Sequence, residues 1–268
     1  MPTAAVGDLL RDWRHRRHRS QMDLALDVGV SPRHLSFVET GRSRPSPELV
    51  LALARHLEVP LREQNALLLA AGYAPRFHET SLDDDAMARI RASLQRMLDA
   101  HDPYPGVVID RQWNVVLANA AALQLTAGVP DHLLGPELNV FRLSLHPEGL
   151  AARTRNFEDW ATYLLGQIRR TVRITGDQRM AAIEEEVRAY PNVAALPDRP
   201  LVEDEPPLLV PVVLDMGGTD VSLFTTLTTF GTPRDVTLDE LAVELFFPAD
   251  DAAEDVLRGA TTAGVGAG

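Results

Sequence analysis

The chain has 268 residues, of which 45% are hydrophobic and 24% charged, and its formal net charge at pH 7 is −12. These values are typical of a globular protein long enough for two domains, and they exclude an intrinsically disordered chain. The absence of cysteine excludes disulfides, thiolate metal sites and a cysteine nucleophile. No apolar run reaches the roughly 18–20 residues that a membrane span needs. Residues 1–10 lack the pattern of a secretory signal, so we expect a cytoplasmic protein without a membrane partner.

The charge is divided unevenly along the chain. Residues 1–79 hold 11 arginines and 9 carboxylates, a net charge of +2, whereas the rest holds 15 arginines and 29 carboxylates, a net charge of −14. Five of the arginines fall within residues 11–19. This asymmetry indicates a nucleic-acid partner for the first part of the chain. A solvated helix face is the alternative explanation.

Residues 5–72 are predicted to form five short helices, each bounded by a capping residue, a proline or a glycine. Ser20 and Ser31 are the predicted N-caps of the second and third helices, because their hydroxyls accept hydrogen bonds from the first turn. Gly29 ends the second helix, since glycine tolerates the left-handed backbone. The second to fifth helices are predicted over residues 21–28, 32–40, 45–56 and 60–71.

The second and third helices have the spacing of a bihelical DNA-binding unit. Ala25 is small where two steeply crossing helices approach each other, and Gly29 permits the sharp turn between them. The apolar positions predicted to form the buried wedge are Leu24, Val28, Val30, Leu35 and Val38. The start of the third helix is left facing outward, where such a helix enters the major groove. A hairpin used only for packing is the alternative, and the agreement of all these positions disfavours it.

The segment from Ser20 to Pro60 resembles the helix-turn-helix of the XRE class, which is lambda-repressor-like. The resemblance implies a DNA-binding domain over residues 1–79, with a phosphate contact from Gln21 and base contacts from the third helix. Arg33 is the best candidate for a bidentate contact to guanine. The predicted DNA-binding residues are Gln21, Ser31, Arg33, His34, Ser36, Phe37, Arg42 and Arg44. The two arginines after the third helix suit phosphate contacts, and simple solvent exposure is the alternative for each side chain.

From Pro105 the hydrophobic pattern changes from helical to strand-like, after an acidic linker at residues 83–85 and a helix over residues 86–100. Residues 106–109 and 113–118 are predicted as a hairpin. A helical region over 139–191 and a loop over 192–207 follow, and then strands over 208–214, 221–230 and 241–247. Within the helical region, Asn156 and Asp159 resemble a capping box.

This order of elements predicts an α+β, PAS-like sensor domain over residues 80–260, in which helices cover one face of a sheet and leave a ligand cavity. Residues 261–268 are rich in glycine and alanine and are predicted to be a disordered tail. The predicted fold is therefore a two-domain protein, with an all-α five-helix domain followed by an α+β domain.

Four segments of the second domain resemble the ligand-binding domain of MmyB-like transcription regulators. They are DRQWNVVLANAAA (110–122), NVFRLSLHPEGL (139–150), FEDW (157–160) and TTFGTPRDVTLDELAVELFFPAD (228–250). The resemblance implies a fatty-acyl ligand and a homodimer.

An acyl ligand needs an apolar tunnel for its chain and a donor for its carboxylate. The predicted ligand-binding residues are Trp113, Arg142, His146, Trp160, Leu164, Phe224, Thr226 and Phe230. The last three share one face of a predicted strand, and Arg142 or His146 would bind the carboxylate. The alternatives are plain core packing for Trp160 and Phe224, an ion pair for Arg142 and a loop cap for His146.

These features predict a sequence-specific transcription regulator that binds palindromic double-stranded DNA as a homodimer and senses a small apolar ligand. The alternative is a second domain that serves protein interaction or dimerisation without a small ligand. We expect no enzyme, catalytic residue, cofactor or metal site, because the sequence lacks HExxH, GxSxG, P-loop and GxGxxG motifs.

Overall fold

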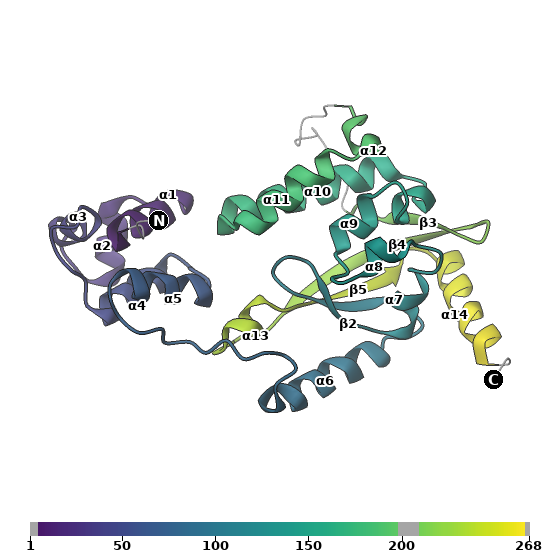
Figure 1. Cartoon of the computed structure of the whole chain (residues 1–268), viewed down its shortest axis with the longest axis horizontal. Helices are drawn as coiled ribbons and strands as arrows, with labels where there is room; N and C mark the ends of the chain where they lie inside the picture. The colour runs from purple at the N-terminus through teal and green to yellow at the C-terminus, as the bar shows by residue number, and fades with distance from the viewer. Residues whose placement is uncertain (1–4, 198–208, 266–268) are drawn as a thin grey trace. The chain divides into compact units, whose positions relative to one another are not determined.

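The computed structural model describes residues 5–197 and 209–265, and these fall into two compact units (Figure 1). The first unit contains the chain up to Ser81 together with a separate segment, Gly231–Asp239, which we call the inserted segment. The second unit contains Leu82–Phe230 and the chain from Glu240 onward. The sequence predicted a boundary near residue 80, but it did not predict that the inserted segment folds with the first unit. No described helix is long and apolar enough to cross a membrane.

The first unit has the five helices that the capping pattern predicted. They are α1 (Val6–Arg16), α2 (Gln21–Val28), α3 (Pro32–Glu39), α4 (Pro47–His56) and α5 (Leu61–Ala70). Ser20 and Ser31 cap α2 and α3 by accepting hydrogen bonds from backbone N–H groups. Gly29 ends α2 with a φ of 75°.

The predicted wedge forms the core of this unit. Leu24, Ala25, Leu35 and Val38 are buried, and Val28 and Val30 are partly buried against them. The helix-turn-helix therefore packs through the residues that the spacing indicated.

The second unit is built on a five-stranded antiparallel sheet. Its strands are β1 (Gly106–Ile109), β2 (Val115–Ala118), β3 (Val212–Met216), β4 (Thr219–Thr229) and β5 (Ala242–Pro248). They lie in the order β2-β1-β5-β4-β3, so that β1 and β5 are neighbours although most of the unit separates them in sequence. This confirms the α+β, PAS-like arrangement.

Helices cover both faces of the sheet (Figure 1). The α-helices of this unit are α6 (Ala88–Asp99), α7 (Ala120–Gln124), α8 (Asp131–Leu134), α9 (Val140–Leu145), α10 (Phe157–Thr175), α11 (Gln178–Arg188), α12 (Pro191–Ala194) and α14 (Asp251–Val265). Helix α13 (Val236–Glu240) lies almost wholly in the inserted segment. Helices α9, α10 and α11 share one hydrophobic core with β3 and β4. On the other face, Leu98 of α6 and Leu245 of β5 both lie against Gly106. The sequence had placed helices over one face only.

Several local predictions differ from the structure for identifiable reasons. Strand β2 begins at Val115 rather than residue 113, because Asp110 accepts hydrogen bonds from the N–H groups of Gln112 and Asn114 and holds a turn. Trp113 lies in this turn with a φ of 65°. The capping box predicted at Asn156 is wrong: its side-chain amide binds the backbone of residues 211 and 213 instead of capping α10.

The last part of the chain also differs from the prediction. Helix α14 runs to Val265, past the predicted start of a disordered tail at residue 261, and residues 266–268 lie outside the described part of the chain. Helix α12 occupies the start of the predicted loop over residues 192–207, most of which also lies outside the described residues. The strand predicted from residue 208 begins at Val212.

The packing of α1 against α3 gives a test of this fold. A Cβ atom on Gly7 would lie 2.5 Å from the carbonyl oxygen of Val38 and 2.7 Å from that of Glu39. Gly7→Ala should therefore lower the free energy of unfolding by about 1–3 kcal/mol, because backbone atoms must move apart. Gly166→Ala in α10 is the matched control, since nothing lies within 4 Å of its Cβ position. It should stabilise by about 0.5–1 kcal/mol, as alanine usually does in a helix. Chemical denaturation measures both, and equal effects would contradict the described packing.

Candidate DNA-binding surface and ligand cavity

The first functional surface is the outward side of α3 and the turn after it. Arg33 and Arg42 are exposed, whereas Phe37 is half-buried between them. The guanidinium carbons of Arg33 and Arg42 lie 5.3 and 5.9 Å from the centroid of the Phe37 ring. The ring thus contacts two cationic side chains, Arg33 from the start of α3 and Arg42 from the turn after it. His34 and Ser36 are half-buried beside them, and Ser31 is exposed at the N-cap.

A buried carboxylate fixes this helix to its neighbours. Glu39, the last residue of α3, is 2% exposed. Its carboxylate accepts two hydrogen bonds from Arg14 of α1 at 2.7 and 2.9 Å, and a third at 2.7 Å from the amide of Gln21. Burial alone would raise the pKa of Glu39, but the hydrogen bonds from Arg14 and Gln21 outweigh it and hold the pKa below its ordinary value. Glu39 therefore stays ionised and ties three helices together.

Two of the predicted phosphate contacts have structural partners. The amide of Gln21 is engaged by Glu39. Arg44 donates to the carbonyl oxygens of Ala71 and Gly72 at 3.0 and 3.2 Å, and its guanidinium lies 4.8 Å from the centroid of the Tyr73 ring. Arg44 thus caps the C-terminus of α5. The phosphate contacts predicted for both residues remain predictions.

The inserted segment is hydrogen bonded to α5 and to the chain that follows it. The carboxylate of Asp239 accepts a hydrogen bond at 2.9 Å from the backbone N–H of Leu61, at the start of α5. The carboxylate of Asp235 accepts bonds from the backbone N–H and the hydroxyl of Thr80, the latter at 2.7 Å. These contacts fix the connection between β4 and β5 to the DNA-binding unit.

The structure places two of the predicted ligand residues in the general core of the second unit. Trp160 and Leu164 of α10 are 5% and 2% exposed, and the Trp160 ring stacks on Tyr163. The ring of Trp113 packs at 4.7 Å against that of Phe141.

The predicted face of β4 lies opposite the face that carries the cavity described below. Phe224 pairs with Phe247 of β5 and stacks on its ring at 5.4 Å, while Thr226 pairs with Leu245 and is exposed. Side chains alternate along a strand, so these residues point away from the side of Glu244 and Phe246. Phe230 lies just beyond the end of β4. A ligand role for this face remains a prediction.

The predicted carboxylate donors also have partners. Arg142 binds both carboxylate oxygens of Glu186, at distances between 2.7 and 3.1 Å. The hydrogen bond from Arg142 holds the pKa of Glu186 below its ordinary value. The hydroxyl of Tyr190 donates to the same carboxylate, and the Tyr190 ring makes an edge contact with His146. To bind the carboxylate of a ligand, Arg142 would have to release Glu186.

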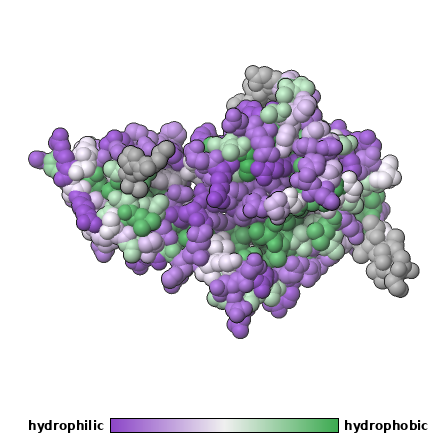
Figure 2. Space-filling view, in the orientation of Figure 1, coloured by the Kyte–Doolittle hydropathy of each residue, from purple (hydrophilic) through white to green (hydrophobic). Residues whose placement is uncertain are grey.

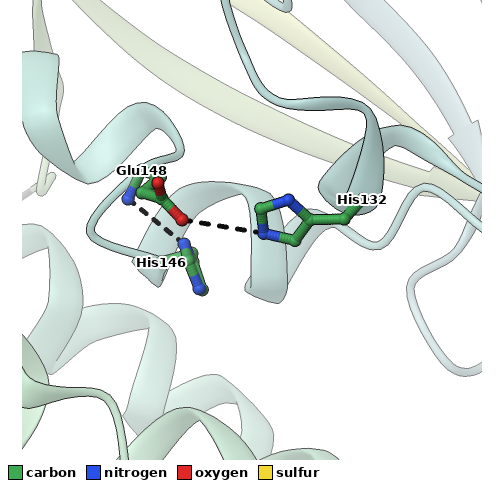
Figure 3. Close-up of side chains that lie close together, drawn as sticks. All are labelled: His132, His146 and Glu148. Carbon is green, nitrogen blue, oxygen red and sulfur yellow. Dashed lines mark hydrogen bonds and ion pairs between the residues drawn. The ribbon is translucent and has the colours of Figure 1, made fainter.

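Two histidines and a glutamate, one of them His146, lie close together (Figure 3). His132 lies in α8, and His146 and Glu148 follow α9, with one potential ligand atom from each within 4.8 Å of the other two. These are donor types that bind zinc. However, Nδ1 of His146 accepts a hydrogen bond from the Glu148 N–H at 3.1 Å, so a cation would have to displace this bond or the proton on Nε2. We assign no metal to the cluster.

An apolar cavity opens between the sheet and the short helices that follow β2. The hollow, together with the open solvent at its mouth, amounts to about 530 Å³. The lining residues are Pro105, Val107, Val115, Ala118, Ala122, Leu123, Leu125, Thr126, Leu138, Val140, Leu143, Ser144, Leu150, Glu244 and Phe246. Figure 2 shows a band of hydrophobic side chains over β2 and α7 on this side of the unit. A second hollow, against Met216 and Leu257, shares Pro105 and Leu125 with the first.

One ionisable side chain lines the cavity among the described residues. Glu244, in the middle of β5, is 5% exposed, and its Oε2 atom has no hydrogen-bond partner. Burial raises the pKa of Glu244 to about 7, and a hydrogen bond with Thr225 only partly opposes this shift. Sequence reasoning missed Glu244, although a lone carboxylate within the apolar run Ala242–Phe247 was a signal.

Residues 90–260, more than half of the chain, match the family model of the MmyB-like transcription regulator ligand-binding domain. The chain belongs to the MmyB-like transcription regulators. Residues 5–67 match the model of a helix-turn-helix domain. Both matches confirm the resemblances noted in the sequence.

The DNA-binding part of this MmyB-like regulator is also similar to curated proteins. It is 37% identical over 67 residues to the transcriptional regulator ClgR of two Mycobacterium tuberculosis strains, CDC 1551 / Oshkosh and ATCC 25618 / H37Rv. The match covers 25% of this chain and 57% of each relative, so this chain spans little more than half the length of ClgR. The MmyB-like regulator is thus a DNA-binding transcription regulator with a ligand-binding domain.

Proposed function

We propose that this cytoplasmic regulator binds a palindromic operator as a homodimer, and that an acyl ligand in the cavity of the second unit alters its affinity for DNA. The observation that carries the proposal is the apolar cavity in a domain of a ligand-binding family, on the same chain as a helix-turn-helix. No catalytic chemistry is required for this function.

The DNA-binding part of the proposal rests on α3. Arg33 offers a planar pair of donors at the start of the helix, and Phe37 limits its freedom before DNA arrives. Less side-chain entropy is then lost on binding, which favours Arg33 as the reader of a guanine. Arg42 lies after the helix and suits a phosphate.

The proposals of a homodimer and a palindromic operator rest on the small size of the surface that contacts bases. One helix-turn-helix contacts only a few base pairs, so two copies are needed for useful specificity. We infer half-sites about one helical turn apart. The residues from 80 onward, with a net charge of −14, should be repelled by phosphate and take no part in the DNA contact.

The ligand part of the proposal rests on the chemistry of the cavity lining. Branched aliphatic side chains make up eight of its fifteen lining residues, four of them from β1, β2 and α9. Such surfaces bind hydrocarbon chains through burial of apolar area. The second hollow shares Pro105 and Leu125 with this cavity, and we infer that a longer chain would extend into it.

The inserted segment gives a route from ligand to DNA. It is flanked by β4 and β5 in sequence, and β5 carries Glu244 and Phe246 of the cavity lining. The same segment is hydrogen bonded to α5 and Thr80 of the DNA-binding unit. We infer that ligand binding shifts β5, and that this shift alters how the inserted segment is held against the DNA-binding unit.

Substitution at Arg33 tests base recognition. Arg33→Ala should weaken specific binding by about 1–3 kcal/mol and relax the preference at one base position, because a bidentate contact is lost. Arg42→Ala should weaken all sequences alike and reduce the salt slope by about one. Binding to a randomised pool at several salt concentrations measures both. Arg33 would be removed from the reading surface if its variant kept the original base preference.

A pair of threonine substitutions tests the location of the ligand. Thr126 lines the cavity, whereas Thr226 is exposed on the opposite side of the sheet. Thr126→Trp should abolish binding of methyl octanoate, measured by calorimetry, because the indole occupies space that the ligand needs. Thr226→Trp should leave binding unchanged. The reverse result would favour the β4 face as the ligand wall, and no binding to the parent chain would favour an interaction module without a small ligand.

A further inference from the structure

We propose that Glu244 is the polar anchor of the cavity: its protonated carboxyl donates a hydrogen bond to the carbonyl of an uncharged acyl ligand, and the site discriminates against a free carboxylate. The inference deepens the proposed function and rests on it. It names the head group that this cavity selects.

Glu244 lies within a strand of the sheet and not in a loop. It pairs with Val107 of β1 and with Leu227 of β4, so neighbouring strands fix its backbone on both sides. Its side chain shares a face with Phe246, which also lines the cavity. The buried Oε2 atom has no hydrogen-bond partner, which is unfavourable for a polar atom removed from water. A ligand atom that accepts a hydrogen bond there would recover part of this cost.

The groups that face Glu244 leave a ligand carboxylate without a cation. Strands β1, β2 and β4 present Val107, Val115 and the hydroxyl of Thr225, and α7 presents Ala122. Helix α9 presents Val140, Leu143 and Ser144 to the cavity. The one arginine of α9, Arg142, is held by Glu186 and is not among the lining residues. A carboxylate head would thus be buried beside another carboxyl group, which is unfavourable for both.

An uncharged carbonyl fits the protonation state of the site. Because the pKa of Glu244 is raised to about 7, its neutral form is well populated at neutral pH and can donate a proton to a hydrogen bond. Ionisation at higher pH removes the donor. The apparent affinity for a carbonyl ligand should therefore fall by about tenfold for each pH unit above 7.

Three probes with the same eight-carbon chain test the head group on the full-length protein. They are methyl octanoate, octanoate and octylamine, and their binding is measured by calorimetry at pH 6 and pH 9. We expect methyl octanoate to bind most tightly at pH 6 and to lose about a hundredfold in affinity at pH 9. Octanoate should bind more weakly than the ester at both values.

Two variants assign the pH dependence to Glu244. Glu244→Gln keeps an N–H donor of the same length but cannot ionise, so it should bind methyl octanoate equally at pH 6 and pH 9. Glu244→Met fills the same space without a donor, and it should bind the ester more weakly than Glu244→Gln does. Far-ultraviolet circular dichroism confirms that both variants are folded.

The outcomes separate this inference from the proposed function. Suppose that Thr126→Trp blocks the ester but Glu244→Gln keeps the pH dependence of the parent chain. The cavity is then the ligand site, but Glu244 does not bind the head group. Tightest binding of octylamine, strengthening toward pH 9, would make Glu244 the anion of an ion pair and overturn the donor role. Tightest binding of octanoate would overturn the discrimination against carboxylates. If no probe binds to the parent chain, both proposals fail.

Discussion

Two neighbouring strands of the sensor sheet, β4 and β5, are joined by a segment that folds with the DNA-binding unit. The chain therefore passes between the two units at residues 81–82, 230–231 and 239–240 rather than once. Asp235 and Asp239 hold the segment by hydrogen bonds to Thr80 and to the start of α5. Strand β5 begins three residues after Asp239 and also lines the apolar cavity, so one short stretch of chain links the cavity lining to the DNA-binding unit.

Two buried glutamates illustrate how the units differ. The carboxylate of Glu39 accepts three hydrogen bonds, so it stays ionised and holds α1, α2 and α3 together. Glu244 has an unpartnered oxygen in an apolar surround, and its pKa is raised to about 7. The first arrangement suits a structural role. The second leaves a buried hydrogen-bonding group without a partner, a feature that is common at binding sites.

The sequence predicted the parts of this structure that depend on local chemistry. Capping hydroxyls, the glycine at the end of α2 and the apolar spacing determine the helix-turn-helix within about twenty residues, and all were recognised. The order of strands and helices likewise indicated the α+β fold. The contacts that were missed join residues far apart in sequence: Arg44 with Ala71, Asn156 with β3, and Asp239 with Leu61. No local pattern specifies such pairs.

The lack of information on long-range pairing also explains why the face of β4 predicted to bind the ligand lies opposite the cavity. The predicted face of β4 was chosen from alternation alone, which shows that Phe224 and Thr226 share a face but not which face meets the helices of the cavity. That depends on the pairing of β4 with β5 and of β5 with β1, and this pairing places Glu244 and Phe246 on the cavity side. A lone glutamate in an apolar strand was a visible signal, but its meaning required the cavity.

The central claim is that ligand and DNA binding are coupled through the inserted segment. Its most direct test is the DNA affinity of the full-length chain, with and without saturating methyl octanoate, in the parent and in Asp235→Ala. The account predicts that the ligand changes the DNA affinity of the parent and of the control Asp255→Ala, whose side chain is exposed on α14. It predicts a smaller change in Asp235→Ala, although this variant still binds the ester. An undiminished change in Asp235→Ala would contradict the account.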